Sequence, residues 1–365
     1  MPHTPAIFRL FLIFAVLLGC AKKAPKVGPD VAPILPSPDA SRYAVASGIP
    51  RDPLVARVVG KGLPWDEALS GAATALVLDD THKPSLSRAH WAAIRAGYPY
   101  PVVALTLGEV PAGEPPTGLV ESLKEQLVPG SHLGLVRARV SVNKDRWLAL
   151  IGRSSGKLTD FPRELGLGDE LQFDMAGGGS FHVLSPSGWR AEQALPHIAA
   201  LGEVGEWWYE IIDPKGRRVA SFPVHVGMAT PKAAMLELPG EVPESAADVA
   251  DWLLEDVNEL RQAFVRSPVQ VDETLTTLAS LPLEHWLGGT WDRAEGESRL
   301  QGAGFVGGEV AQVACNGPTI ATCLDGLLRT VDGRAALLHP DLRLLGHAVE
   351  LRTDGLSLVL NLASE

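Results

Sequence analysis

The chain has 365 residues, of which 46% are apolar and 21% charged, so there is ample material for packed cores. A chain of this length is expected to form two or three domains. The formal net charge is -11, and the basic residues are scattered rather than clustered. Nucleic-acid binding requires concentrated Lys and Arg, so we expect no nucleic-acid partner.

The first nineteen or so residues have the three regions of an export signal. The α-amine and Arg9 form a short positive start, an apolar run follows over 10–18, and the small residue Gly19 precedes Cys20. The run is too short to span a bilayer, which takes about 20 apolar residues. The chain has no second long apolar stretch, so no other membrane span is expected.

The segment Leu17-Leu18-Gly19-Cys20 resembles the lipobox of bacterial lipoproteins. The resemblance implies that 1–19 is a signal peptide, and that Cys20 becomes the mature N-terminus. It also implies that Cys20 carries a diacylglycerol and acyl chains such as palmitate. The membrane would then be a partner through the N-terminal lipid. The expected location is the cell envelope, on the periplasmic or outer-membrane face.

The region 20–50 is rich in Pro and Ala, a composition that favours extended chain without a core, and we expect a tether there. Besides Cys20, the chain contains Cys315 and Cys323. An even remainder of thiols in an oxidising compartment predicts a disulfide between them, and two buried thiols are the alternative.

Three folded regions are expected after the tether. Region 51–157 predicts a mixed α/β domain, with apolar residues at helical spacing over 52–63, 65–80, 85–98 and 117–130, and paired strands over 132–142 and 146–153. Region 158–229 consists of short apolar runs separated by Gly, Pro, Asp and Ser, typical of a small β-sandwich domain. Region 230–245 is expected to be a linker.

Region 246–365 predicts a third domain. A strong amphipathic helix is expected over 247–265, and further helices over 273–288 and 321–338. Two strands around the turn Thr353-Asp354-Gly355 close the chain.

This last region resembles the CAP superfamily, also called SCP-like, in its bacterial secreted form. The resemblance depends on the order of five pieces: the helix 253–261, the segment 298–305, Gly308-Glu309-Val310, the segment 333–340, and Leu345-Gly346-His347 with the strands around it. It implies an α-β-α sandwich. The expected fold class is therefore a multi-domain α/β protein with a mixed α/β unit, a small all-β sandwich and a CAP-like sandwich.

Many CAP domains build a cleft from two His and two Glu that can hold a divalent metal. On this resemblance Glu309 stands at the place of a family Glu, whereas Gly333 and Gly288 stand where the two His are expected. His285 lies three positions from Gly288. One carboxylate without imidazole partners holds a metal poorly and has no second group for acid–base chemistry. We therefore expect no metal and no cofactor, with Glu309 solvated or paired with an Arg such as Arg334.

Two classes of function follow. The first is a non-enzymatic envelope lipoprotein whose degenerate CAP-like domain binds a ligand or an envelope protein. The second is a metal-assisted or peptidoglycan-directed hydrolase that uses Glu309 with His285 or His347. The substitutions at both histidine positions favour the first class.

Overall fold

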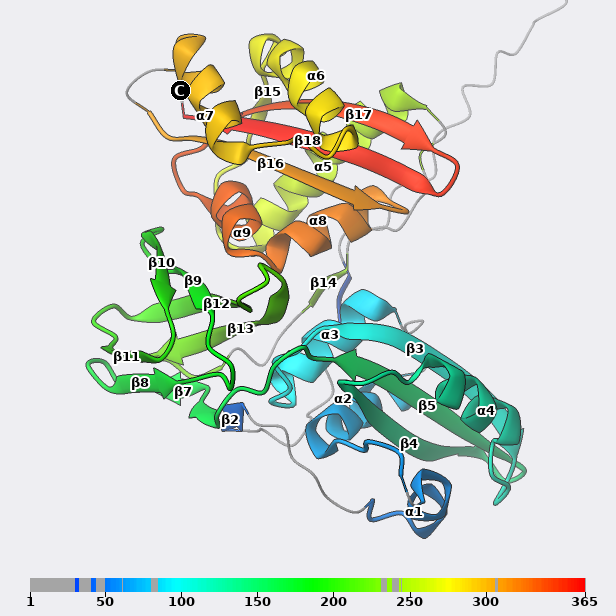
Figure 1. The fold of residues 1–365 in the computed structure, drawn as a ribbon. Helices are drawn as coiled ribbons and strands as arrows, with labels where there is room; N and C mark the ends of the chain where they lie inside the picture. The colour runs from blue at the N-terminus through cyan, green and yellow to red at the C-terminus, as the bar shows by residue number, and fades with distance from the viewer. Residues whose placement is uncertain are drawn as a thin grey trace, which may run out of the picture.

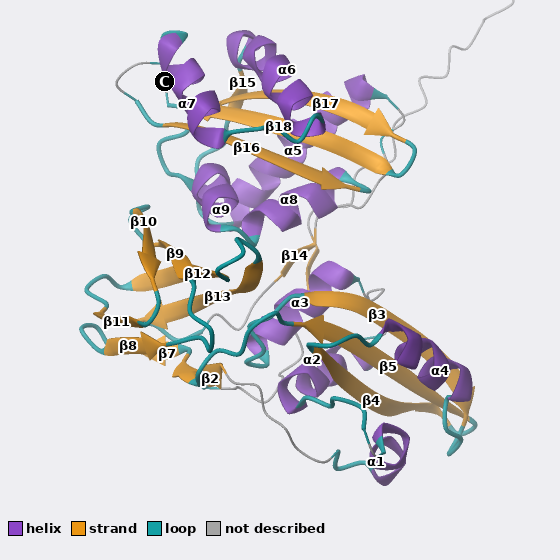
Figure 2. Cartoon of the chain, viewed as in Figure 1, coloured by secondary structure: helices purple, strands orange, loops and turns teal. Residues whose placement is uncertain are grey.

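The computed structural model describes residues 30–32, 41–43, 50–60, 62–79, 85–230, 235–237, 243, 245–305 and 308–364. It consists of three units, each built around its own sheet (Figures 1 and 2). The fold class is mixed α/β, as the sequence predicts. Within these residues, none of the helices combines the length and the apolar character needed to cross a bilayer.

The first unit is an antiparallel sheet in the order β3-β5-β4, with helices on both faces. The central strand β5 is buried on both sides, which explains its unbroken apolar run. Its residues Leu148 and Leu150 face α2 and α3, and Trp147 faces the side of α1 and α4. The elements are α1 (Pro53–Val59), α2 (Glu67–Val77), α3 (Leu86–Arg95), β3 (Val102–Pro111), α4 (Thr117–Gln126), β4 (Ser131–Ser141) and β5 (Lys144–Arg153).

The middle unit is mostly β. Its main sheet has the order β10-β9-β12-β13-β7, in which only the β13–β7 pair is parallel, and β8 pairs separately with β11. Aromatic rings including Phe173, Tyr209 and Phe222 fill the space beneath the sheet. The strands are β6 (Phe161–Pro162), β7 (Glu164–Leu165), β8 (Glu170–Phe173), β9 (Ser180–Leu184), β10 (Arg190–Ala194), β11 (His197–Ala200), β12 (Gly205–Ile212) and β13 (Arg218–Val226).

Two stretches of the region expected to be a tether form short strands. β1 (Asp30–Ala32) pairs with β14 (Met235–Glu237), which lies within the expected linker, and β2 (Arg42–Tyr43) pairs with β6. Tyr43 is fully buried among aromatic rings, and its hydroxyl donates a hydrogen bond to the carbonyl oxygen of Pro223 at 2.8 Å. Burial of this one aromatic side chain attaches the region to the middle unit. Cys20 and the expected signal peptide lie outside the described residues.

The C-terminal unit is a three-layer α-β-α sandwich. Its sheet has the order β15-β17-β18-β16, with α6 and α7 on one face and α5, α8 and α9 on the other (Figure 1). The elements are α5 (Ala246–Ala263), β15 (Gln270–Val271), α6 (Glu273–Leu287), α7 (Arg293–Gly302), β16 (Val310–Gly317), α8 (Ile320–Leu328), α9 (Val331–Leu338), β17 (Leu344–Arg352) and β18 (Gly355–Ala363).

Strand register assigns each side chain of this sheet to one face, because successive side chains alternate. Gln312, Asn361 and Gly346 form one row across β16, β18 and β17, on the face covered by α6. The adjacent row, Ala311–Leu362–Leu345, belongs to the main core beneath α5 and α8. This alternation decides which candidate site residues can meet.

The segment 321–338 was expected to be one helix, and the structure divides it into α8 and α9. The break occurs because the hydroxyl of Thr330 accepts the backbone N–H of Gly333 and so caps a new helix. Helix α9 contributes side chains to two hydrophobic cores. Val331 and Ala335 pack into the core of the first two units, whereas Leu337 belongs to the core of the C-terminal unit.

Candidate functional site

Glu309 lies directly before β16 and is exposed. Its carbonyl oxygen accepts the N–H of Ser364 at 2.9 Å, so the β16–β18 register continues through it. The alternation of the strand then directs its side chain to the face of α5, α8 and α9. The Glu309 carboxylate interacts electrostatically with the imidazole of His339, which lies just after α9. Burial lowers the pKa of His339, and the negative charge of Glu309 partly opposes that shift.

Sequence analysis did not identify His339 as a site residue. It lies two residues after Leu337 and coincides with neither position at which a histidine was expected, 288 or 333. Its Nδ1 accepts the backbone N–H of Asp341 at 3.2 Å, which leaves the proton of the neutral ring on Nε2. The Glu309–His339 neighbourhood is therefore the one place where the predicted carboxylate has an imidazole nearby among the described residues.

His347 lies on the same face of the sheet as Glu309 but far along it. It is opposite Leu360 on β18, which is opposite Val313 on β16, four positions after Glu309. At about 3.3 Å per residue and about 4.8 Å per strand, the two backbone positions are more than about 15 Å apart. Burial lowers the pKa of His347, because the half-buried position disfavours the charged form of the ring.

His285 lies on the other side of the sheet. It belongs to α6, which packs on β17 and β18 on the face that carries Asn361, and its carbonyl oxygen accepts the N–H of Thr290 at 2.9 Å. The sheet therefore separates His285 from Glu309. The structure brings neither histidine named from the sequence to this carboxylate.

The two glycines at the expected histidine positions differ in their surroundings. A Cβ at Gly333 would lie 2.4 Å from the carbonyl oxygen of Leu327, so no larger side chain fits there without backbone movement. At Gly288 the nearest atom is the carbonyl oxygen of Glu284 at 3.3 Å, a tight but tolerable contact. Close packing between α8 and α9 therefore requires glycine at position 333 and leaves no room for a histidine side chain.

Arg334 does not pair with Glu309, and the exposed position of Glu309 corresponds to the other alternative, a solvated carboxylate. Its guanidinium is buried and forms an ion pair with Glu206 on β12 of the middle unit. It also lies 4.4 Å from the ring centroid of Trp208 and 5.1 Å from that of Phe264. The reason is the orientation of α9, which directs this side chain toward the middle sheet and away from the end of β16.

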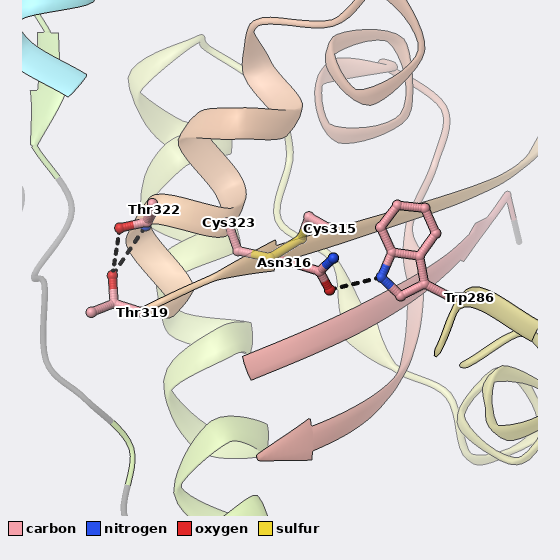
Figure 3. Close-up of a disulfide and its surroundings, with 6 residues drawn as sticks. All are labelled: Trp286, Cys315, Asn316, Thr319, Thr322 and Cys323. Carbon is pink, nitrogen blue, oxygen red and sulfur yellow. Dashed lines mark hydrogen bonds between the residues drawn. A yellow bond between two sulfur atoms is a disulfide. The ribbon is translucent and has the colours of Figure 1, made fainter. Parts of the chain in front are cut away.

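Cys315 and Cys323 form a disulfide between β16 and α8, with a Cα–Cα distance of 5.5 Å (Figure 3). The corner between them is well bonded: Trp286 Nε1 donates to Asn316 Oδ1 at 2.9 Å, and the hydroxyl of Thr319 caps α8 by accepting the N–H of Thr322. Both cysteines are buried. The arrangement is that of a structural crosslink.

A buried row of amides in the C-terminal sheet is also fully engaged. Gln312 accepts from Trp291 Nε1 at 3.0 Å and donates to Asn361 Oδ1 at 2.8 Å, and Asn361 donates to the carbonyl oxygen of Leu275 at 2.9 Å. These groups satisfy one another and are not directed at a ligand. Across the described part of the chain, no group of three or more His, Cys, Asp and Glu side chains is placed to hold a metal ion.

No family model matches the chain, and no curated protein does. Among solved structures it is similar to a cysteine-rich secretory protein from Staphylococcus aureus, with a TM-score of 0.29 and 14% identity over 52% of this chain and 66% of that one, just under two thirds. It is similar to an outer surface protein from Borrelia burgdorferi, with a TM-score of 0.28 and 17% identity over 35% of this chain and 100% of that one.

A third similar structure is an extracellular protein containing an SCP domain from Bacillus anthracis. The TM-score is 0.27 and the identity 10%, over 67% of this chain and 70% of that one. These scores are low, and the three-layer fold of the C-terminal unit is evident from its own strand order and helix packing.

Proposed function

We propose that this chain is an exported, lipid-anchored envelope protein whose CAP-like C-terminal unit binds a ligand or an envelope protein without catalysing a reaction. The observation that carries the non-catalytic part is the separation of Glu309 from both predicted partners. His347 lies two side-chain rows away, and His285 lies on the opposite face of the sheet.

Acid–base chemistry requires two groups that can reach the same substrate, and a structural or catalytic zinc requires three or four protein ligands. Glu309 and His339 together supply one carboxylate and one imidazole. Gly333 cannot be replaced by a histidine at the present backbone spacing. The residues of the family cleft therefore do not provide a set of groups sufficient for metal-assisted hydrolysis.

One observation favours a second candidate function. The charge of Glu309 acts on His339, so a hydrolase would use this pair rather than His285 or His347. A turbidity assay on purified peptidoglycan tests it. We expect no clearing above that of a buffer control, and equal results for Glu309→Gln and His339→Ala. Clearing that is lost in both variants would replace the binding proposal with the hydrolase.

Anchoring is supported by the order of Arg9, the apolar run 10–18 and Cys20. The test is detergent phase partitioning of the full chain produced in a bacterial host that lipidates such proteins. We expect the wild type in the detergent phase and Cys20→Ser in the aqueous phase, because Cys315 and Cys323 are joined to each other. A wild type that remains aqueous contradicts the anchor.

A further inference from the structure

The three units meet at one place, which we call the three-unit junction. It consists of His90 and Trp91 on α3, Trp208 on β12, Asp325 on α8, and Arg329 directly after α8. Trp91 Nε1 donates to Asp325 Oδ1 at 2.9 Å, and the rings of Trp91 and Trp208 have centroids 5.7 Å apart. Each unit therefore contributes at least one side chain to the same contact.

Two hydrogen bonds from Ser221 to backbone carbonyl oxygens also connect the units at the junction. The hydroxyl of Ser221 on β13 donates to the carbonyl oxygen of Arg329 at 2.5 Å, and the N–H of Ser221 donates to the carbonyl oxygen of Pro99 at 3.1 Å. Ser221 thus links the middle sheet to the C-terminal unit on one side and to the first unit on the other.

His90 is buried in this region with 2% of its surface exposed, and neither ring nitrogen has a hydrogen-bond partner among the described residues. Burial without a hydrogen-bond partner strongly disfavours the cationic form of an imidazole, so the neutral form predominates in such a position. Burial lowers the pKa of His90 well below its usual value, and the positive charges of Arg329 and Arg218 lower it further.

The acids that pair with these two arginines are already engaged. On α8, Asp325 forms an ion pair with Arg329 at 2.9 Å. On the middle sheet, Glu210 forms an ion pair with Arg218 at 2.6 Å, and its second oxygen accepts the N–H of Val331 at 3.1 Å. A proton placed on His90 would therefore meet two cations, and among the described residues neither ring nitrogen has an acceptor in hydrogen-bond contact.

We propose that the three-unit junction is an acid-sensitive contact, in which uptake of one proton by His90 is coupled to separation of α3 from α8 and the middle sheet. The proton comes from solvent and reaches the ring only in the open form. Closed protein carries neutral His90, and open protein carries the imidazolium hydrated by water. Acidification therefore favours the open form by mass action.

The size of the effect follows from the usual imidazole pKa of about 6.5 in the open form. With no protonation in the closed form, the opening constant rises about tenfold at pH 5.5 and about thirtyfold at pH 5.0, relative to pH 7.5. Opening would expose Trp91, Trp208 and the α9 residues Val331 and Ala335, which now pack in the shared core. These side chains would thus form a surface that becomes accessible in acidic surroundings.

Hydrogen–deuterium exchange of the full chain tests the proposal, with rates corrected for the intrinsic effect of pH. Between pH 7.5 and 5.5 we expect amides of α3 and α8 to exchange about tenfold faster. Amides at the centre of β18, within the C-terminal sheet, should change much less. Unchanged rates in α3 and α8 over this range would overturn the proposal.

The decisive variant is His90→Leu, which fills similar volume and cannot titrate. We expect it to remove the acid acceleration in α3 and α8. The matched control is His197→Leu, because His197 is buried in the aromatic core of the middle unit, away from the junction, and should leave the acceleration intact. Acceleration that survives in His90→Leu would assign it to another buried histidine, such as His225, and refute the proposal.

His90→Gln serves if His90→Leu does not fold, since it is also unable to titrate in this range. A direct measurement is equally sharp: the ring of His90 in the wild type, followed by NMR, should remain neutral in the closed form down to pH 5.5. A ring that titrates near pH 6.5 without faster exchange would contradict the coupling.

Discussion

Replacing Arg334 with Ala is the sharpest test of how the C-terminal unit is held to the middle unit. Its guanidinium forms an ion pair with Glu206 and lies over the rings of Trp208 and Phe264. The substitution removes both interactions at once and leaves space beside a fully buried tryptophan. It should therefore lower the free energy of unfolding of the two units together.

The magnitude can be worked out from the burial of the two partners. The Arg334 side chain is 6% exposed and that of Glu206 31% exposed. Breaking a fully buried ion pair costs about 3–5 kcal/mol, and partial solvation of Glu206 reduces this to about 1–2 kcal/mol. Loss of the cation–π contacts adds about 0.5–2 kcal/mol. We expect a total of about 1.5–4 kcal/mol. The loss should be smaller for Arg334→Lys, which keeps the charge without the planar group.

The assay is urea unfolding followed by tryptophan fluorescence and circular dichroism. The matched control is Arg299→Ala on α7, which removes an exposed ion pair with Glu295 between side chains 33% and 54% exposed. That variant should lose no more than about 0.5 kcal/mol. Equal effects of the two substitutions would refute the claim that Arg334 joins the units.

Three further predictions concern stability. Replacing both Cys315 and Cys323 with Ala should lower the free energy of unfolding by up to about 2.6 kcal/mol, from a closed loop of about nine residues, and reduction of the wild type should have a comparable effect in the same urea titration. Burial lowers the pKa of His197 to about 4. Since the unfolded ring has a pKa of about 6.5, its contribution is complete above pH 6.5 and is lost progressively as the pH falls to 4, by up to about 3 kcal/mol, and His197→Leu should flatten that part of the stability–pH curve. An isolated fragment 246–365 exposes Val331 and Ala335, so it should be less stable than the same region in the full chain, and equal exchange protection of α9 in both would contradict the shared core.

Much of the C-terminal unit could be predicted because its signals are local. The helix expected over 247–265 forms as α5, with Val249, Leu253 and Val257 on the buried side, as the helical spacing predicts. The two closing strands form around the expected turn. What the helical pattern could not show is that Arg261 is fully buried, with its guanidinium donating to the carbonyl oxygens of Ser267, Leu337, His339 and Leu342.

The site was harder to predict because it depends on which face each residue takes in the assembled sheet. Glu309, His285 and His347 are separated by strand register and by the helix layer to which each belongs, neither of which is visible in a linear sequence. The contact between Arg334 and Glu206 joins residues 128 positions apart. The strand at Arg42–Tyr43 was missed because a single buried tyrosine in a Pro-rich region gives almost no periodic signal.

Calorimetric titration of the purified full chain with zinc tests the central claim most directly. The claim is that the C-terminal unit does not assemble a set of side chains sufficient to hold a metal ion. We expect no stoichiometric tight site in the wild type, and identical traces for Glu309→Gln and His339→Ala. One tight site per chain that disappears in Glu309→Gln would contradict the account and establish a metal-binding cleft.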